Sequence, residues 1–258
     1  MFFYSKYKKN LGQHALINKK IKNKIIAALN ISNTDVIFEI GAGDGCISSS
    51  LIQFDKNVFL IELDITLSNI LKKKFAFLSH VVVFNDDILT FNFNYIIKDH
   101  SKFRIFGNIP YNISTQIMLV LIRLSKHVED IHLVVQKEFA DKLCIKTHGF
   151  LSYVSFLRYY HYSFTRIFNI TAGSFIPKPC VDSVFIKLKV KKKLYLLNFF
   201  LFKKFIKVIF KNRKKKIIVI VPKISILYKY FNISSRPDIL LLKEYIRLFN
   251  LLYIIKTK

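Results

Sequence analysis

The sequence predicts an α/β fold, a mostly parallel sheet with helices between its strands, followed by a small helical domain. Up to about residue 190, short branched-apolar runs alternate with longer segments of helical periodicity. This alternation is typical of strand–helix–strand units with right-handed crossovers. From the run Lys191-Lys192-Lys193 onward, helical spacing continues with almost no turn signals. The change in composition predicts two domains, residues 1–190 and residues 191–258.

Seven strands are expected in the first domain. Five are branched-apolar runs at Val36–Ile40, Val58–Ile61, Val81–Phe84, Phe103–Phe106 and Ile131–Val135. Two later runs, joined by a stretch that contains Phe175–Pro179, are expected to form a closing antiparallel pair; they are Ser163–Ile170 and Ser183–Val190. Helical spacing predicts helices over Ile47–Gln53, Ser114–Leu124, Leu196–Phe210 and Ile239–Tyr253.

Composition limits the classes of function. The 258 residues carry 42 basic and 16 acidic side chains, a formal charge of +26, yet 52% are hydrophobic and 15% aromatic. This apolar content supports a real core and excludes intrinsic disorder, while the uninterrupted apolar stretches are far shorter than the roughly 20 residues of a membrane span. Residues 191–258 hold 18 basic and two acidic residues, a net +16, against +10 for residues 1–190. We therefore expect a polyanionic partner, most commonly nucleic acid.

The first residues and the cysteines indicate a cytoplasmic protein. Residues 1–10 contain three lysines and no apolar signal-peptide core. Cys46, Cys144 and Cys180 are far apart and form no CxxC pair, which argues against a disulfide framework and a cysteine-rich zinc site. We expect no membrane partner and no metal.

A glycine-rich turn follows the first predicted strand. In Glu39-Ile40-Gly41-Ala42-Gly43-Asp44-Gly45 the glycines let the backbone pass close to a ligand, but Cys46 breaks the GxGxxG dinucleotide pattern. Glu62 follows 21 residues after Gly41, at the end of the second strand, where a carboxylate can accept both hydroxyls of a ribose. Separately, the two features could be a plain tight turn and a solvated strand end. Together they favour a nucleoside cofactor at Gly41, Gly43 and Glu62.

The third strand ends in Asn85-Asp86-Asp87-Ile88. The Asp87 carboxylate would face the same crevice and could accept a hydrogen bond from an adenine amino group. It could equally be a helix N-cap, and the sequence leaves both interpretations open.

The fourth strand runs into Phe106-Gly107-Asn108-Ile109-Pro110-Tyr111-Asn112. Asn-x-Pro-Tyr at this place is the motif of amino-group methyltransferases that act on adenine or cytosine. An exocyclic amine is a poor nucleophile because its lone pair is delocalised into the ring, and the Asn108 side-chain oxygen and the Ile109 carbonyl can each accept one of its N–H groups. Pro110 stiffens the turn, and Tyr111 offers a ring on which an extruded base can stack. The alternative is a Pro-Tyr turn packed on the core.

With these motifs assembled, the chain resembles the ribosomal RNA adenine dimethylase family from Lys8 to about Leu248. The segment Lys8–Leu16 is similar to the family's basic-Phe-Gly-Gln-Asn-Phe-Leu motif, with His14 at the usual Asn and Ala15 at the usual Phe. The glycine-rich turn and the Asn108–Tyr111 turn also fit. Further matching segments are Glu62-Leu63-Asp64, Asp87, Gln136-Lys137-Glu138 and Phe175–Ser183.

The resemblance implies a Rossmann-like class I methyltransferase that uses S-adenosylmethionine. The positions that correspond to the family's cofactor contacts are His14, Leu16, Gly41, Glu62, Asp87 and Asn108. Phe175 would form the second face of the base-stacking slot, opposite Tyr111, unless it is a core aromatic before a proline turn. The implied reaction is N6,N6-dimethylation of two adjacent adenines in a 3′-terminal hairpin of small-subunit (16S) ribosomal RNA. The implied partner is the immature 30S particle in ribosome biogenesis, and the enzyme would be a monomer.

The basic tail carries two further signatures. Phe210–Lys216 resembles the family's Asn-Arg-Arg-Lys loop, and Arg236-Pro237-Asp238-Ile239 resembles its closing Arg-Pro helix signature. A basic run is commonly a solvated surface, but in a domain of net +16 phosphate contact is plausible. The expected RNA-binding residues are Lys211, Arg213, Lys214, Lys215 and Lys216.

Three alternative functions share part of this pattern. A large-subunit (23S) RNA dimethylase of the antibiotic-resistance type shares every cofactor motif, but the tail signatures and the nearly whole-length match favour the small subunit. A non-catalytic RNA-binding assembly or transcription factor on the same fold predicts loss of Asn108, Tyr111 or the glycine-rich turn, and none is lost. An NAD-dependent dehydrogenase is disfavoured by the missing third glycine and by the Asn-x-Pro-Tyr turn.

Overall fold

The computed structural model describes residues 13–54, 57–100, 102–144, 152–191, 195–212, 214–221, 234 and 236–257. Two compact units make up the chain, Met1–Ala140 with Tyr162–Val190, and Asp141–His161 with Lys191–Lys258. One boundary of the second unit, at Lys191, coincides with the change in composition. The second unit also contains Asp141–His161, which the composition assigns to the first domain. The reason is that this segment carries aromatic side chains, Phe156 among them, that pack on the helices of the tail.

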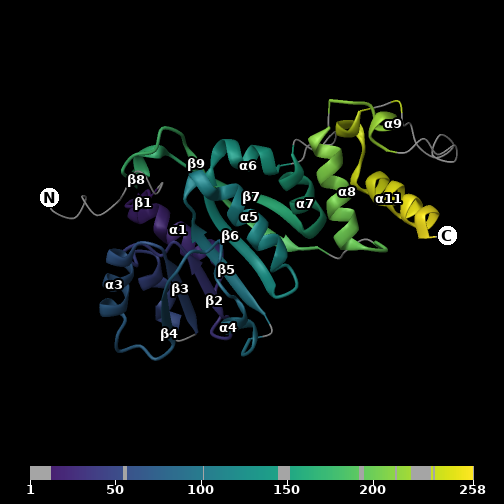
Figure 1. Cartoon of the computed structure of the whole chain (residues 1–258). Helices are drawn as coiled ribbons and strands as arrows, with labels where there is room; N and C mark the ends of the chain where they lie inside the picture. The colour runs from purple at the N-terminus through teal and green to yellow at the C-terminus, as the bar shows by residue number, and fades with distance from the viewer. Residues whose placement is uncertain are drawn as a thin grey trace. The chain divides into compact units, whose positions relative to one another are not determined.

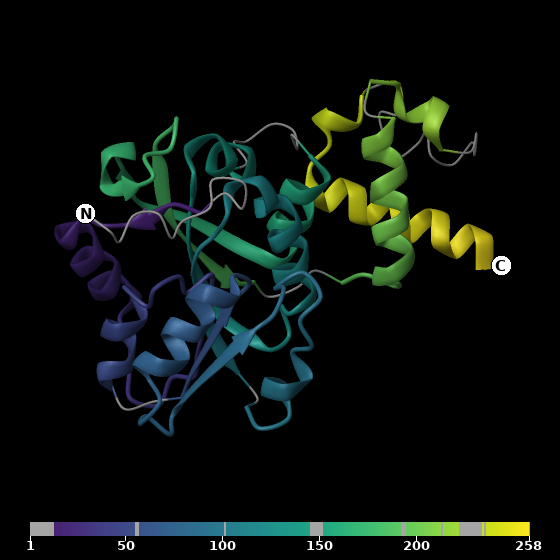
Figure 2. The same ribbon diagram turned by 60° about the vertical axis from the view of Figure 1, so that its left-hand side comes forward.

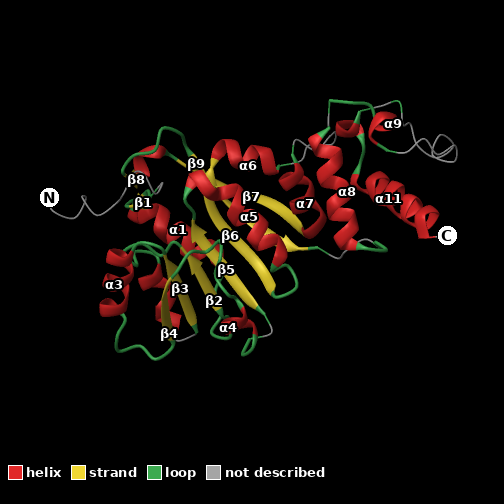
Figure 3. Ribbon diagram, viewed as in Figure 1, coloured by secondary structure: helices red, strands yellow, loops and turns green. Residues whose placement is uncertain are grey.

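The first unit is built on a seven-stranded sheet (Figures 1 and 3). Its strands are β2 (Ile37–Ile40), β3 (Val58–Glu62), β4 (Val81–Asn85), β5 (Phe103–Asn108), β6 (Val128–Gln136), β7 (Tyr162–Ile170) and β9 (Ser183–Val190). In space they follow the order β4-β3-β2-β5-β6-β9-β7. The first five are parallel, and β9 runs antiparallel to both β6 and β7. The structure confirms the mostly parallel sheet and its closing antiparallel pair.

The middle of the sheet is buried on both faces. All four residues of β2 are buried, as are all residues of β5 except its last, and this is why both strands are continuous apolar runs in the sequence. Aromatic rings pack against β2, where the ring centroid of Phe38 lies 5.1 Å from that of Phe93. The chain leaves β2 toward β3 on one side, while β5 lies on the other. Such a switch point opens a crevice at the carboxyl ends of the strands.

The helices of the first unit are α1 (Lys19–Leu29), α2 (Ser48–Leu51), α3 (Ile65–Lys74), α4 (Asn94–Ile97) and α5 (Ser114–Arg123), and α6 (Lys137–Leu143) runs from it into the second unit. Short 3-10 turns occupy Ile52–Phe54, Tyr111–Ile113 and Ala172–Ser174. The helix expected over Ile47–Gln53 is α2 continued by the first of these turns. Asp64 begins α3 as its N-cap, accepting a hydrogen bond from Thr66 N at 2.8 Å.

Two short segments that are far apart in the sequence lie side by side near the amino-terminal end of the described chain (Figure 1). Strand β1 (Ala15–Leu16) pairs antiparallel with β8 (Phe175–Ile176), with Leu16 opposite Phe175. Just beyond the pair, Ile17 N donates to Ser174 O at 2.9 Å. The segment that precedes α1 is thereby attached to the loop between β7 and β9.

The second unit is helical in the described residues. It contains α7 (Tyr153–His161), α8 (Phe199–Lys211), α9 (Ile217–Ile220), the 3-10 turn η6 (Pro237–Ile239) and α11 (Leu242–Thr257). Figure 2 shows α8 crossing α11. At this crossing Phe202 contacts Phe249, with 5.2 Å between ring centroids. None of the described helices combines the length and apolarity needed to cross a membrane.

Candidate active site

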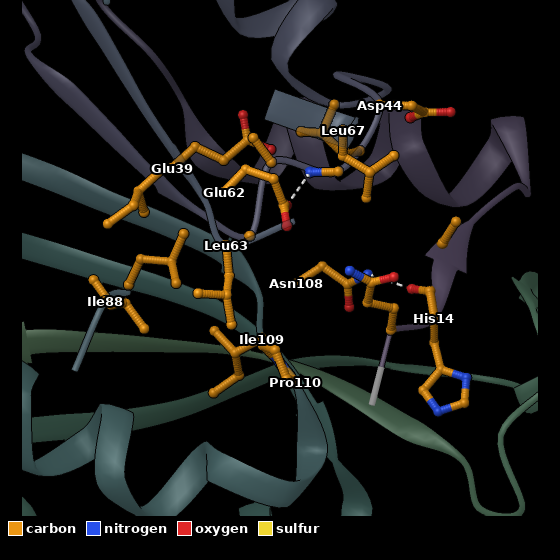
Figure 4. Close-up of a pocket in the computed structure, with 18 of the residues that line it drawn as sticks. His14, Glu39, Asp44, Glu62, Leu63, Leu67, Ile88, Asn108, Ile109 and Pro110 are labelled. Carbon is orange, nitrogen blue, oxygen red and sulfur yellow. Dashed lines mark hydrogen bonds between the residues drawn. The ribbon is translucent and has the colours of Figure 1, made fainter. Parts of the chain in front are cut away.

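A pocket opens at the carboxyl ends of β2, β3, β4 and β5 (Figure 4). The residues predicted for cofactor binding all line it, and so do all four residues of the predicted catalytic turn, with Asn108 belonging to both sets. From the two sets these are His14, Leu16, Gly41, Gly43, Glu62, Asp87, Asn108, Ile109, Pro110 and Tyr111. Segments separated by up to about a hundred residues in sequence therefore meet at one crevice, as the strand order requires.

The glycine-rich turn takes a backbone path that favours glycine. Gly41 and Gly43 have φ values of +69° and +61°, in the left-handed region. Gly45 is restricted by space as well, because a Cβ atom there would lie 2.9 Å from the Leu71 side chain of α3. This packing gives a physical reason for the GxGxG spacing.

Glu62 is held at the end of β3 by backbone donors. Its Oε2 accepts from Gly43 N at 2.8 Å and its Oε1 accepts from Asp64 N at 3.0 Å. The residue is only 5% exposed, and burial raises its pKa, while the Asp64 and Gly43 N–H groups oppose that rise. Each carboxylate oxygen keeps a further lone pair, which suits acceptance from two hydroxyl groups of a ligand.

Glu39 is a pocket residue to which the sequence analysis gave no role. It is 3% exposed and accepts a hydrogen bond from Ser48 Oγ at 2.5 Å. Burial raises its pKa to about 8, so the carboxyl group is largely protonated at neutral pH. Its position directly before the glycine-rich turn is the sequence signal that could have identified it.

Asp87 serves as a turn cap and also lines the pocket. Its Oδ1 accepts from Leu89 N at 2.8 Å, which closes the turn after β4. Asp87 caps this turn and not a helix, because the next described helix, α4, begins only at Asn94. The second carboxylate oxygen leaves the residue able to accept a hydrogen bond from a ligand, so the adenine-amino role stays a prediction.

Asn108 connects the catalytic turn to the N-terminal segment. Its Nδ2 donates to His14 O at 2.7 Å (Figure 4). A carbonyl can only accept, so this bond fixes the orientation of the amide and leaves Oδ1 as the acceptor end. The turn that follows is braced by Ser114, whose Oγ donates to the carbonyls of Pro110 and Tyr111, each at 3.1 Å.

Tyr111 is held at its hydroxyl and on one face. Its hydroxyl makes a 2.5 Å hydrogen bond with Ser183 Oγ on β9, and its ring stacks on the His14 imidazole, with 5.1 Å between centroids and 27° between planes. Burial raises the pKa of the phenol, so it stays neutral at physiological pH.

Phe175 lies in the core of the first unit. It is 1% exposed, belongs to a core cluster with Leu16 and Phe185, and is absent from the residues that line the pocket. In this structure Phe175 packs as a core aromatic, and its role as the second face of a base slot opposite Tyr111 stays a prediction. Pairing of β8 with β1 turns the ring into the core, which is the alternative the sequence had left open.

The predicted RNA-binding residues lie at and after the end of α8. Lys211, Lys214, Lys215 and Lys216 are all exposed, and Arg213 lies outside the described residues. Among the described residues, no group of three or more His, Cys, Asp or Glu side chains could hold a metal ion.

Comparison with known proteins gives a consistent result. A family model described as ribosomal RNA adenine dimethylase matches residues 4–224. The chain is 32% identical over 215 residues to ribosomal RNA small subunit methyltransferase A of Sulfurihydrogenibium sp., covering 82% of this chain and 83% of the relative. It is 35% identical over 212 residues to the protein of that name from Buchnera aphidicola subsp. Acyrthosiphon pisum, covering 80% and 77%.

Two solved structures share the fold. A dimethyladenosine transferase from Plasmodium falciparum aligns with a TM-score of 0.70 at 28% identity, covering 84% of this chain and 78% of that one. The 23S rRNA methyltransferase ErmE aligns with a TM-score of 0.69 at 19% identity, covering 91% and 98%. At 19% identity, the likeness to ErmE concerns the fold alone.

Proposed function

The chain belongs to the ribosomal RNA adenine dimethylase family, and from this premise we propose that it dimethylates N6 of two adjacent adenines in the 3′-terminal hairpin of small-subunit ribosomal RNA. It is an RNA-modifying methyltransferase, and its relatives at 32% and 35% identity are named for the small subunit. The observation that carries the chemical part of the proposal is the hydrogen bond from Asn108 Nδ2 to His14 O, which leaves an acceptor at the end of β5.

The pocket fits S-adenosylmethionine, which supplies a methyl group activated by a sulfonium centre. Glu62 would accept the ribose hydroxyls, and Asp87 the adenine amino group. The backbone around Gly41 and Gly43 would pass along the rest of the cofactor, with Leu16 closing the edge. The fit rests on the two backbone-held oxygens of Glu62 and on the left-handed turn beside it.

The charge of the pocket also separates this cofactor from a dinucleotide. Its described lining includes five acidic residues and neither a lysine nor an arginine; the five are Glu39, Asp44, Glu62, Asp86 and Asp87. Glu39 is largely protonated at neutral pH, but the other four acidic residues of the lining would repel a diphosphate, at an unfavourable electrostatic cost. A ligand with a sulfonium and an ammonium group is electrostatically complementary to such a lining.

The catalytic turn can orient the amine of the base. Asn108 Oδ1 and the Ile109 carbonyl would each accept one N–H of the adenine amino group, which favours a lone pair directed at the incoming methyl. Tyr111 would stack on the extruded base. The proton lost by the amine needs no strong base, because the leaving group is already activated.

The basic tail would dock the RNA. Residues 191–258 carry a net +16, and the lysines that follow α8 are exposed where phosphate contact is possible. We propose that the enzyme acts as a monomer in the cytoplasm and that its substrate is the immature 30S particle. Residues 191–258 are proposed as the RNA-docking part and residues 1–190 as the cofactor-binding and catalytic part, with Asp141–His161 packing in the helical unit.

The choice of subunit can be tested directly. The protein is incubated with methyl-labelled S-adenosylmethionine and, separately, with immature small and large subunits. We expect label in small-subunit RNA. Label in large-subunit RNA alone would contradict the proposal and favour the antibiotic-resistance type of dimethylase.

A further inference from the structure

We propose that the His14 side chain is a positioning residue for the target base: it stacks on one face of the Tyr111 ring, and the adenine would stack on the other face. The proposal rests on the proposed function, in which Tyr111 stacks on the extruded base. It gives the His14 side chain a role toward the base, while the cofactor contact that the family resemblance implies for this position stays a prediction.

The imidazole of His14 is fixed by contacts on two sides. Its Nδ1 lies 2.6 Å from Pro177 O, and since a carbonyl only accepts, Nδ1 carries the proton and donates. The ring then lies against Tyr111, 5.1 Å away between centroids and tilted by 27°. Offset stacking of this kind stabilises an aromatic pair beyond the area that it buries.

The Tyr111 ring is consequently held at two places. Ser183, which is fully buried on β9, bonds the phenol oxygen at 2.5 Å. His14 covers one ring face. A ring restrained in this way loses little conformational freedom when a base stacks on its second face, and such preorganisation favours binding of the flipped base.

The backbone and the side chain of His14 have separate tasks. The carbonyl oxygen accepts the hydrogen bond of Asn108 Nδ2, a contact that any residue at position 14 could make. The ring contact depends on the side chain. His14 is thus an aromatic neighbour of Tyr111, whereas Phe175, within β8, is buried in the core cluster with Leu16 and Phe185.

The His14 side chain differs from the residue type of the family motif. Relative to the family motif, His14 replaces an asparagine and Ala15 replaces a phenylalanine. An asparagine side chain has no ring to stack on Tyr111. The His14 ring therefore adds an aromatic contact to the slot at a position where the family motif has none.

The test compares wild type with H14A and H14F, assayed on immature small subunits. We expect H14A to lower kcat about tenfold, a fold-change within the range of one aromatic pair, while the KM for S-adenosylmethionine stays within about twofold. H14F keeps the ring and loses only the bond to Pro177 O, so its kcat should stay within about threefold of wild type. With 2-aminopurine at the target adenine, stacking quenches the fluorescence in wild type and H14F, and we expect less quenching in H14A.

The outcomes distinguish a failure of the proposed His14 role from a failure of the proposed function. Equal kcat for H14A and wild type, or a loss in H14F as large as that in H14A, would overturn the role of the ring while leaving the proposed function intact. A wild-type protein that transfers no methyl group to small-subunit RNA would overturn the proposed function and this inference with it. Melting temperatures of both variants accompany the assay, and H14F remains informative if H14A folds poorly.

Discussion

The proposed chemistry depends on Asn108, whose replacement by alanine removes both the donor Nδ2 and the acceptor Oδ1. Loss of the donor affects stability, and loss of the acceptor affects turnover. The donor Nδ2 holds His14 O at 2.7 Å, and a hydrogen bond of this kind contributes about 0.5–1.5 kcal/mol to stability. Each kcal/mol corresponds to a fall in Tm of about 2–4 °C for a chain of this size. We therefore expect N108A to fold, with a Tm lower by a few degrees.

The loss of the acceptor Oδ1 acts on the transition state instead. Removing one preorganised hydrogen-bonding group costs about 10²–10³ in kcat, or about 2.7–4 kcal/mol. We expect N108A to show this loss in methyl transfer to immature small subunits. Binding of the RNA in a filter assay should remain within about twofold of wild type. The exposed Asn169 of β7, which does not line the pocket, provides the matched control N169A.

Two results would refute this reasoning. Unchanged turnover of N108A would remove Asn108 from the chemistry. A parallel loss of RNA affinity and of turnover, with a Tm fall much larger than a few degrees, would show that the residue acts through folding alone.

Three further predictions concern charge. Arg104 donates to Asp130 at 2.8 Å inside the first unit. Removing one partner of a buried ion pair costs about 3–5 kcal/mol, and we expect R104M to lower the free energy of urea unfolding at neutral pH by at most this amount, because Lys187 Nζ still lies 3.1 Å from Asp130 Oδ2. Burial raises the pKa of Asp130, but the hydrogen bond from Arg104 outweighs it and holds this pKa below 3.8. The ion pair therefore stabilises the fold above pH 3.8, and this stabilisation is lost as the pH falls through the lower folded-state pKa. The stability difference between wild type and R104M should accordingly shrink in acid. Burial raises the pKa of Glu39 from 4.5 to about 8, so the stability of the wild type falls as the pH rises from 4.5 to about 8. The Tm of E39Q should depend less steeply on pH. Identical slopes of Tm against pH for E39Q and wild type would contradict the argument from burial. Replacing an exposed lysine after the start of the basic run by alanine should weaken RNA binding and reduce the slope of log affinity against log salt by about one per lost phosphate contact. An unchanged slope would show that the replaced lysine contacts no phosphate. The lysines to be replaced are Lys211, Lys214, Lys215 and Lys216.

Much of the fold and most of the site could be predicted from the sequence because the sheet is parallel and buried. Buried parallel strands are visible as apolar runs, and the residues just after them must meet at one edge. Glu62 and Asn108 are the last residues of β3 and β5, which lie on either side of β2, so the strand order brings both residues to one pocket.

The remainder depended on contacts that leave no periodic signal. Two-residue strands such as β1 and β8 have no periodicity to detect, yet their pairing decides that Phe175 faces the core. The membership of Asp141–His161 in the helical unit rests on ring contacts of Phe156 with residues more than forty positions away. The burial of Glu39 depends likewise on the sheet around it.

We propose that this protein dimethylates adjacent adenines of small-subunit RNA through the Asn108–Tyr111 turn. The most direct measurement is mass spectrometry of nuclease fragments from immature small and large subunits treated with wild type or N108A in the presence of S-adenosylmethionine. The account predicts two neighbouring N6,N6-dimethyladenosines near the 3′ end of small-subunit RNA with wild type, and their near absence with N108A. Dimethyladenosine confined to large-subunit RNA, or equal modification by N108A, would contradict it.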